Sequence, residues 1–205
     1  MTAVTAPAGR AGFLTEAAPG EEVERLYAED LEGQGYVAHL TRVWAHSPEA
    51  LAVLSHLLRL STESAGLDLR RRAVLVAASA AALGDSYCSL AWGSRLAAIA
   101  GDEAATSALT GTDTALSDAE RVLAGWARRV VGDPNGTTAQ DVEELRRVGY
   151  DDEQVFAITL FIALRLAFST VNDALGAPPD AELVGRAPAA VRTAVTFGRP
   201  PAEGV

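Results

Sequence analysis

The chain has 205 residues, of which 49% are hydrophobic and 21% charged, and this balance excludes a wholly disordered protein. All 17 basic residues are arginines, while 27 residues are acidic, so the net charge is −10. The absence of lysine excludes a P-loop lysine and a Schiff base, and the acidic balance argues against a nucleic-acid partner. The single cysteine excludes an intrachain disulfide and a cysteine-rich metal site.

Hydrophobic residues recur with helical periodicity along the chain and hardly ever alternate, which predicts an all-α protein. Ser47 and Asp68 are predicted N-caps, and Pro48 suits the first turn of the helix that follows Ser47. The helices predicted in the first half are separated by short breaks, mostly at glycines, and span residues 21–32, 36–45, 48–64, 69–83 and 86–100.

A short helix and a loop are predicted over residues 102–116, and the capping-box sequence from Ser117 to Glu120 then starts a new helix. The predicted helices of this half run from Ser117 to about 132, from Thr138 to Gly149, from Asp151 to Gly176 and from Pro188 to Thr196. The helix after Asp151 is apolar nearly all round, so we expect it to lie centrally or between subunits.

We predict a single domain over residues 21–197, with flexible tails over residues 1–20 and 198–205. The longest uncharged apolar stretch is shorter than the roughly 18 residues of a membrane span, so we expect no membrane partner. The first residues lack the apolar centre of a signal peptide, and we therefore expect a cytoplasmic protein.

The most informative segment is residues 84–92, which reads GDSYCSLAW. Asp85, Cys88 and Trp92 have the spacing of one helix face, and Asp85 is the expected N-cap. The helix N-terminus favours a Cys88 thiolate, whereas the neighbouring carboxylate raises the pKa of the thiol. A lone cysteine in an alanine-rich helix is also typical of a packed core residue.

This segment resembles the alkylhydroperoxidase AhpD and carboxymuconolactone decarboxylase superfamily, and within it the peroxidase-related proteins. The family motif is a Glu upstream of Cys-x-x-Cys-x-x-x-His. Similarity extends to residues 43–51, 116–121 and 168–180, so that it covers about residues 20–183. The resemblance implies an AhpD-like helical bundle whose central antiparallel helix hairpin carries the cysteine motif.

The chain departs from the family motif at three positions. Asp85 replaces the first cysteine, Trp92 replaces the histidine, and the glutamate position falls near Ala73. Only the second cysteine remains, as Cys88, at the position that the family associates with attack on the peroxide. The resemblance therefore implies the fold, while the dithiol mechanism is lost.

The first functional hypothesis is a one-cysteine thiol peroxidase, an antioxidant enzyme in which Cys88 attacks a hydroperoxide and an external thiol reductant resolves the sulfenic acid. Arg95 or the run Arg70 to Arg72 could supply positive charge. His46 or His56 could act as acid or base if the helix that begins at Pro48 packs against the cysteine helix.

Two alternatives remain open. The first is a non-redox, carboxymuconolactone decarboxylase-like enzyme acting on a small organic acid or lactone, with His46, His56 or Asp85 as acid or base. The second is a catalytically silent protein that binds a small apolar ligand or a partner, with Tyr87 and Trp92 lining an apolar pocket.

The resulting site prediction names Cys88, Asp85 and His46 as catalytic. Substrate binding is assigned to Tyr87, Trp92, Arg95 and His56. No metal is expected because the histidines lack ligand spacing, and no cofactor is expected because no glycine-rich phosphate loop follows a strand. The apolar helix after Asp151 and the family resemblance both favour a homo-oligomer, a dimer, trimer or hexamer.

Overall fold

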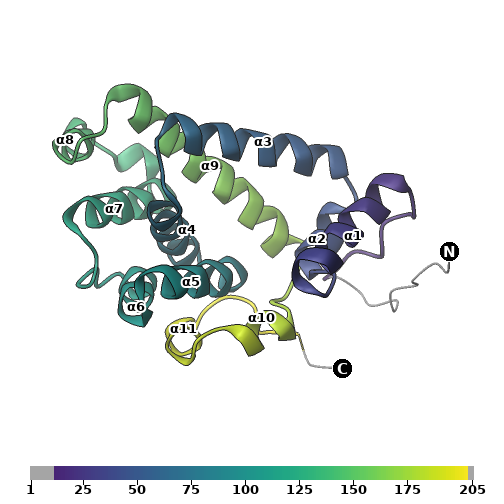
Figure 1. Ribbon diagram of the computed structural model, residues 1–205. Coiled ribbons are helices and arrows are strands. Elements are labelled where there is room, and N and C mark those ends of the chain that lie inside the picture. The colour runs from purple at the N-terminus through teal and green to yellow at the C-terminus, as the bar shows by residue number, and fades with distance from the viewer. Residues whose placement is uncertain (1–11, 203–205) are drawn as a thin grey trace.

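The computed structural model describes residues 12–202, and this range is all α, with no strand. The helices form several layers around α4, which lies near the middle of the molecule (Figure 1). In chain order the elements are α1 (Glu21–Gln34), α2 (His39–Trp44), α3 (Pro48–Ser64), α4 (Leu69–Leu83), α5 (Ser86–Ala100), α6 (Asp102–Thr110), α7 (Asp118–Gly132), the 3-10 turn η1 (Pro134–Gly136), α8 (Ala139–Arg147), α9 (Asp152–Ala174), α10 (Ala181–Arg186) and α11 (Ala189–Ala194).

Capping side chains explain why α4, α5, α7, α8 and α9 begin where the sequence predicts. Asp68 accepts a hydrogen bond from the backbone N–H of Arg71 at 2.7 Å, and Ser117 and Glu120 form the predicted capping box of α7. Ser47 stands at the start of α3 but makes no capping hydrogen bond through its side chain. The short helix α10 was not predicted, because six residues carry too little periodicity to be recognised.

The hairpin of α4 and α5 is the centre of the fold. Every residue from Ala73 to Ala80 is buried, and the many alanines let α5, α7 and α9 approach the α4 backbone closely. Gly84 ends α4 in the left-handed conformation, at a φ of 83°, which glycine adopts without steric cost. Asp85 follows directly as the N-cap of α5, so the predicted helix hairpin is confirmed.

The long helix α9 packs against α3, α4 and α7, as a core helix does. Near the start of α9, Phe156 is 68% exposed, so this part of the helix is not covered within the single chain. By length and composition alone α9 could cross a membrane, but its buried Ser169 and Asn172 face protein partners here. Trp44 Nε1 donates to Asn172 Oδ1 at 2.9 Å, and the Trp44 ring stacks on Phe168 of α9.

Parts of both predicted tails contact the helical domain. The backbone N–H of Phe13 donates to the Leu175 carbonyl at 2.9 Å. Near the other end, Ser86 Oγ donates to the Arg199 carbonyl at 2.7 Å, and a Cβ on Gly198 would collide with the Gly84 carbonyl at 2.4 Å. The segment around Gly198 therefore lies directly on the start of α5.

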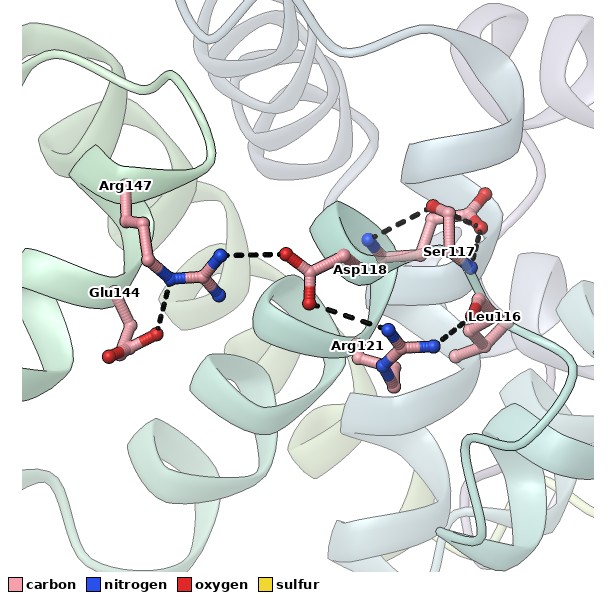
Figure 2. A network of polar contacts seen from close by, with 7 residues as sticks. Leu116, Ser117, Asp118, Arg121, Glu144 and Arg147 are labelled. Atoms are coloured by element: carbon pink, nitrogen blue, oxygen red, sulfur yellow. Dashed lines mark hydrogen bonds and ion pairs between the residues drawn. The ribbon is translucent and has the colours of Figure 1, made fainter.

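A network of ion pairs joins α7 to α8 (Figure 2). Arg147 of α8 contacts Asp118 at 2.7 Å and Glu144 at 2.8 Å, and Arg121 donates to the Leu116 carbonyl at 2.6 Å. We call this set of residues, together with the capping residues Ser117 and Glu120, the α7–α8 network. Every arginine in it contacts an acidic side chain.

Candidate active site around Cys88

Cys88 lies in the first turn of α5, where Asp85 fixes the backbone. Asp85 Oδ1 accepts a hydrogen bond from the Cys88 backbone N–H at 2.9 Å. Asp85 is fully buried and Cys88 is 2% exposed, so this helix start is inside the protein. The predicted N-cap is confirmed, and it brings a carboxylate to the cysteine.

Two side chains of α9 point at the Cys88 sulfur. Arg165 Nη2 lies 3.1 Å from Sγ, and Ser169 Oγ lies 3.6 Å from it. The Asp85 carboxylate, which accepts from the Cys88 backbone N–H, also raises the pKa of the thiol. The sulfur therefore has a guanidinium group in direct contact, and a carboxylate caps the same turn of the helix.

Burial dominates the ionisation of Cys88. It raises the pKa of the thiol to about 12, although Arg165 and Ser169 act in the opposite direction and Asp85 adds to the rise. The helix N-terminus and the arginine do not outweigh this cost of removing a charge from water. Cys88 is therefore a neutral thiol at neutral pH in this conformation.

A second carboxyl group lies near Asp85. Burial raises the pKa of Asp173 to about 6, the Asp85 charge adds to the rise, and Arg199 opposes it. Asp85 Oδ2 has no hydrogen-bond partner within residues 12–202. The Asp85 carboxylate therefore acts on a second, partly buried carboxyl group whose pKa is about 6.

Trp92 is half-buried one helical turn beyond the cysteine, and Arg165 connects it to Cys88. The Arg165 guanidinium carbon lies 5.7 Å from the Trp92 ring centre. Arg95 lies over the same ring at 4.7 Å, so the structure brings Cys88, Asp85, Trp92 and Arg95 into one region. Arg72 of α4 completes it, at 5.8 Å from the ring.

Tyr87 lies elsewhere, in a buried cluster around Asp180. Its hydroxyl donates to Asp180 Oδ2, while Asp180 Oδ1 contacts the His39 ring at 2.7 Å and accepts from the His39 backbone N–H at 3.0 Å. The Tyr87 side chain is therefore occupied in joining α5 to the start of α10. The structure does not place it beside the Cys88 sulfur.

The histidines assigned to the site lie on the surface. His46 Nε2 contacts the Thr15 carbonyl at 3.0 Å, and His56 Nδ1 contacts Arg59 at 3.0 Å. Both are exposed, and α3 packs against α9 instead of α5. The condition under which His46 or His56 could serve as acid or base is therefore not met.

A crevice between α4 and α9 is lined by the two residues that contact the Cys88 sulfur, Arg165 and Ser169, together with Ser79 and Leu83. It has no room for a water molecule. A ligand that approaches Cys88 through this crevice must therefore displace the Arg165 side chain or separate the two helices.

Sequence reasoning missed the two α9 residues at the sulfur, Arg165 and Ser169. One signal for Arg165 was present, because it is the only charged residue between Val155 and Val171. A single charge in such an apolar helix must find a buried partner or reach solvent. No signal in the sequence indicated which helix would face Cys88.

No protein-family model and no curated protein sequence matches the chain. Solved structures do match its fold. An uncharacterized peroxidase-related protein from Ralstonia eutropha JMP134, described as an alkylhydroperoxidase AhpD core, has a TM-score of 0.72 at 22% identity, over 90% of this chain and 100% of its own. A peroxidase-related protein from Silicibacter sp. TM1040 gives 0.72 at 19% identity, over 88% of this chain and 98% of its own.

A third similar structure is the debrominase Bmp8, solved in complex with 2,3,4-tribromopyrrole. Its TM-score is 0.67 at 16% identity, over 85% of this chain and 97% of its own. The chain therefore has the AhpD-like fold that its sequence predicts. At these identities the likeness is one of fold.

Proposed function

We propose that this protein is a peroxidase-related enzyme in which Cys88 reduces an organic hydroperoxide and an external thiol restores the cysteine. The observation that carries the proposal is the contact of Arg165 Nη2 with the Cys88 sulfur at 3.1 Å, at a helix start that the buried Asp85 carboxylate caps. A thiol is activated as a nucleophile when a base takes its proton and a cation stabilises the thiolate. Arg165 is the cation in contact with the sulfur, and Asp85 is the base that we assign to the thiol proton.

The reaction follows from this arrangement. Asp85 accepts the thiol proton while Arg165 holds the developing negative charge on sulfur. The thiolate attacks the terminal peroxide oxygen, the O–O bond breaks, and the proton passes from Asp85 to the departing alkoxide. One thiol and one hydroperoxide give one sulfenic acid and one alcohol, so atoms and electrons balance.

Regeneration requires thiols from outside the protein, because Cys88 is the only cysteine. A first external thiol condenses with the sulfenic acid to a mixed disulfide and releases water. A second thiol then attacks that disulfide and frees Cys88. The consumed reductant leaves as its disulfide.

The test is hydroperoxide consumption with cumene hydroperoxide as substrate and dithiothreitol as reductant. We expect turnover by the wild type, and trapping of a Cys88 sulfenic acid by dimedone, measured by mass spectrometry. Cys88→Ser removes the nucleophile and should show only the background rate. Equal consumption by the wild type and Cys88→Ser would refute the proposal.

Arg165→Met and Arg165→Lys separate charge from packing. Arg165→Met should lower the rate of Cys88 oxidation about tenfold or more, and Arg165→Lys should restore part of it because the charge is retained. Arg59→Met is the matched control, since Arg59 is exposed on α3 and paired with Glu63. A rate unaffected by Arg165→Met would remove the role assigned to this residue.

A catalytically silent protein is the second candidate, and it is favoured by the full burial of Cys88 and by its raised pKa. It predicts that iodoacetamide labels Cys88 only at the rate of global unfolding. The peroxidase hypothesis predicts labelling through local opening, at denaturant concentrations well below those that unfold the protein.

The non-redox alternative loses two of its three proposed acid–base residues, because His46 and His56 lie on the surface.

A further inference from the structure

Three arginines from three different helices converge on one tryptophan ring. Arg72 comes from α4, Arg95 from α5 and Arg165 from α9, and their guanidinium carbons lie 5.8, 4.7 and 5.7 Å from the centre of the Trp92 ring. We call these three residues the arginine cluster. Its members are brought together by tertiary packing, because no two of them share a helix.

The arginine cluster has no acidic partner. Within residues 12–202 no carboxylate oxygen lies within 4.0 Å of any of its guanidinium nitrogens, whereas most other described arginines pair with Asp or Glu. Arg72 and Arg165 each keep a buried Nε without a hydrogen-bond partner in the same range. Such convergence of uncompensated cations is unexpected in a chain whose net charge is −10.

We propose that the arginine cluster is a binding site for a multiply charged oxyanion, of the phosphate or polycarboxylate class. Guanidinium groups donate paired N–H bonds in a planar fork that matches the oxygens of carboxylates and phosphates. Three such groups within 5.8 Å of one ring centre carry more positive charge than a singly charged ligand would neutralise. The proposal goes beyond the peroxide chemistry, and it holds whether or not Cys88 reacts.

The Trp92 ring by itself does not account for the cluster. A ring attracts a cation through its quadrupole but carries no net charge, so it leaves the repulsion among three guanidinium groups in place. That repulsion is evident at Arg72, whose pKa is lowered by burial and then by the charges of Arg95 and Arg165. A bound oxyanion would remove the repulsion and supply acceptors for the unpaired N–H groups.

The test is calorimetric titration of the full chain with inorganic phosphate and, separately, with citrate. Ionic strength is held constant with sodium chloride, because exposed charges are screened by salt. We expect saturable binding of at least one anion, and the more tightly bound of the two identifies the phosphate or the polycarboxylate class. Both Arg95→Gln and Arg72→Gln should weaken that binding about tenfold or more.

Arg71→Gln is the matched control. Arg71 is the neighbour of Arg72 on α4, loses the same charge on substitution, and contacts Asp68 instead of the cluster. Its affinity for the anion should stay within about twofold of wild type. Equal weakening by Arg71→Gln and Arg72→Gln would mean that only net charge matters, and this would overturn the proposal.

Thermal unfolding gives a second readout that does not depend on calorimetric heat. Phosphate or citrate should raise the Tm of the wild type above its value in chloride at equal ionic strength, because a ligand that binds only the folded state stabilises it. The rise should disappear in Arg95→Gln, whose exposed side chain can change without disturbing the core. No saturable binding and no rise in Tm with either anion would refute the site.

Discussion

Arginines gather in two regions of this molecule, in opposite electrostatic settings. In the α7–α8 network, Arg121 and Arg147 pair with Asp118 and Glu144, so the negative carboxylates balance the positive charges of the arginines (Figure 2). Around Trp92 the arginine cluster meets an aromatic ring and a sulfur atom. The arginines that join α7 to α8 are paired with carboxylates, whereas the arginines of the proposed ligand site are not.

The largest loss of stability should come from substituting Asp180, a buried carboxylate that joins α5 to the start of α2. It is 2% exposed and contacts Tyr87 and both the ring and the backbone of His39. Asp180→Ala leaves these donors buried and unpaired, so we expect a loss of about 3 kcal/mol in the free energy of unfolding, measured by urea denaturation. Asp180→Asn keeps two acceptor lone pairs and should cost clearly less; equal losses would show that packing dominates.

The next largest loss of unfolding free energy should come from substituting Glu120, at the buried end of the α7–α8 network. It contacts Arg70 and accepts from the Ser117 backbone N–H at 2.8 Å. Glu120→Ala removes the ion pair and half of the capping box, and should cost about 2 kcal/mol in urea denaturation. Glu120→Gln, which keeps the cap, should lose about half as much. A loss within measurement error would show that this pairing is not stabilising.

The His39–Asp180 contact makes stability depend on pH. The hydrogen bond to Asp180 raises the pKa of His39, although burial acts against it. A raised folded-state pKa gives stability that is complete below the unfolded value of about 6.5 and is lost as pH rises through the folded value. The urea midpoint should therefore fall as the pH rises from about 6.5 through the raised folded-state pKa of His39, and Asp180→Asn should flatten this part of the profile. The same slope in both proteins would exclude His39 as its source.

Removing one arginine of the cluster should raise the free energy of unfolding slightly, whereas the substitutions of Asp180 and Glu120 lower it. Arg72→Gln relieves repulsion from Arg95 and Arg165, so in chloride buffer we expect the free energy of unfolding to stay equal or rise by less than about 1 kcal/mol. Urea denaturation of Arg72→Gln beside Glu120→Ala measures the contrast directly. A loss as large as that of Glu120→Ala would contradict the distinction between paired and unpaired arginines.

The smallest effect is expected on the exposed side of the α7–α8 network. The side chains of Asp118 and Arg147 are 56% and 50% exposed, so water and salt screen their contact. Asp118→Asn should leave the urea midpoint unchanged at 0.15 M salt, which is about physiological ionic strength. A measurable loss that vanishes at 1 M salt would contradict this expectation, because it would show that the exposed pair contributes electrostatic stabilisation.

Much of the fold could be predicted from the sequence because helix ends carry local signals. Asp68, Asp85 and the Ser117 to Glu120 box all cap the helices that they were expected to cap. These interactions span three residues and depend little on the rest of the chain. The AhpD-like architecture followed from the resemblance around Cys88 and is supported by solved structures of the same fold.

The surroundings of Cys88 could be predicted only on its own helix. Asp85 and Trp92 share its face at fixed spacing, but Arg165 and Ser169 are 77 and 81 residues away and reach the sulfur only through the packing of α9. The same lack of long-range information explains why His46 and His56 were expected near the cysteine, whereas both are exposed, His46 just before α3 and His56 on it. Periodicity shows which face of a helix is buried, and it does not show which helix covers that face.

Arg165 is shared, since one nitrogen contacts the Cys88 sulfur and the same guanidinium group lies over Trp92. The shared group links two equilibria, ionisation of Cys88 and binding of an oxyanion by the arginine cluster. If a bound oxyanion lowers the stability of the thiolate by some factor, the thiolate lowers the affinity for the oxyanion by the same factor. An oxyanion held by the arginine cluster would make the Cys88 thiolate less stable, and a Cys88 thiolate would weaken the oxyanion site. Arg165 thus couples the proposed oxyanion site to the reactivity of the Cys88 sulfur.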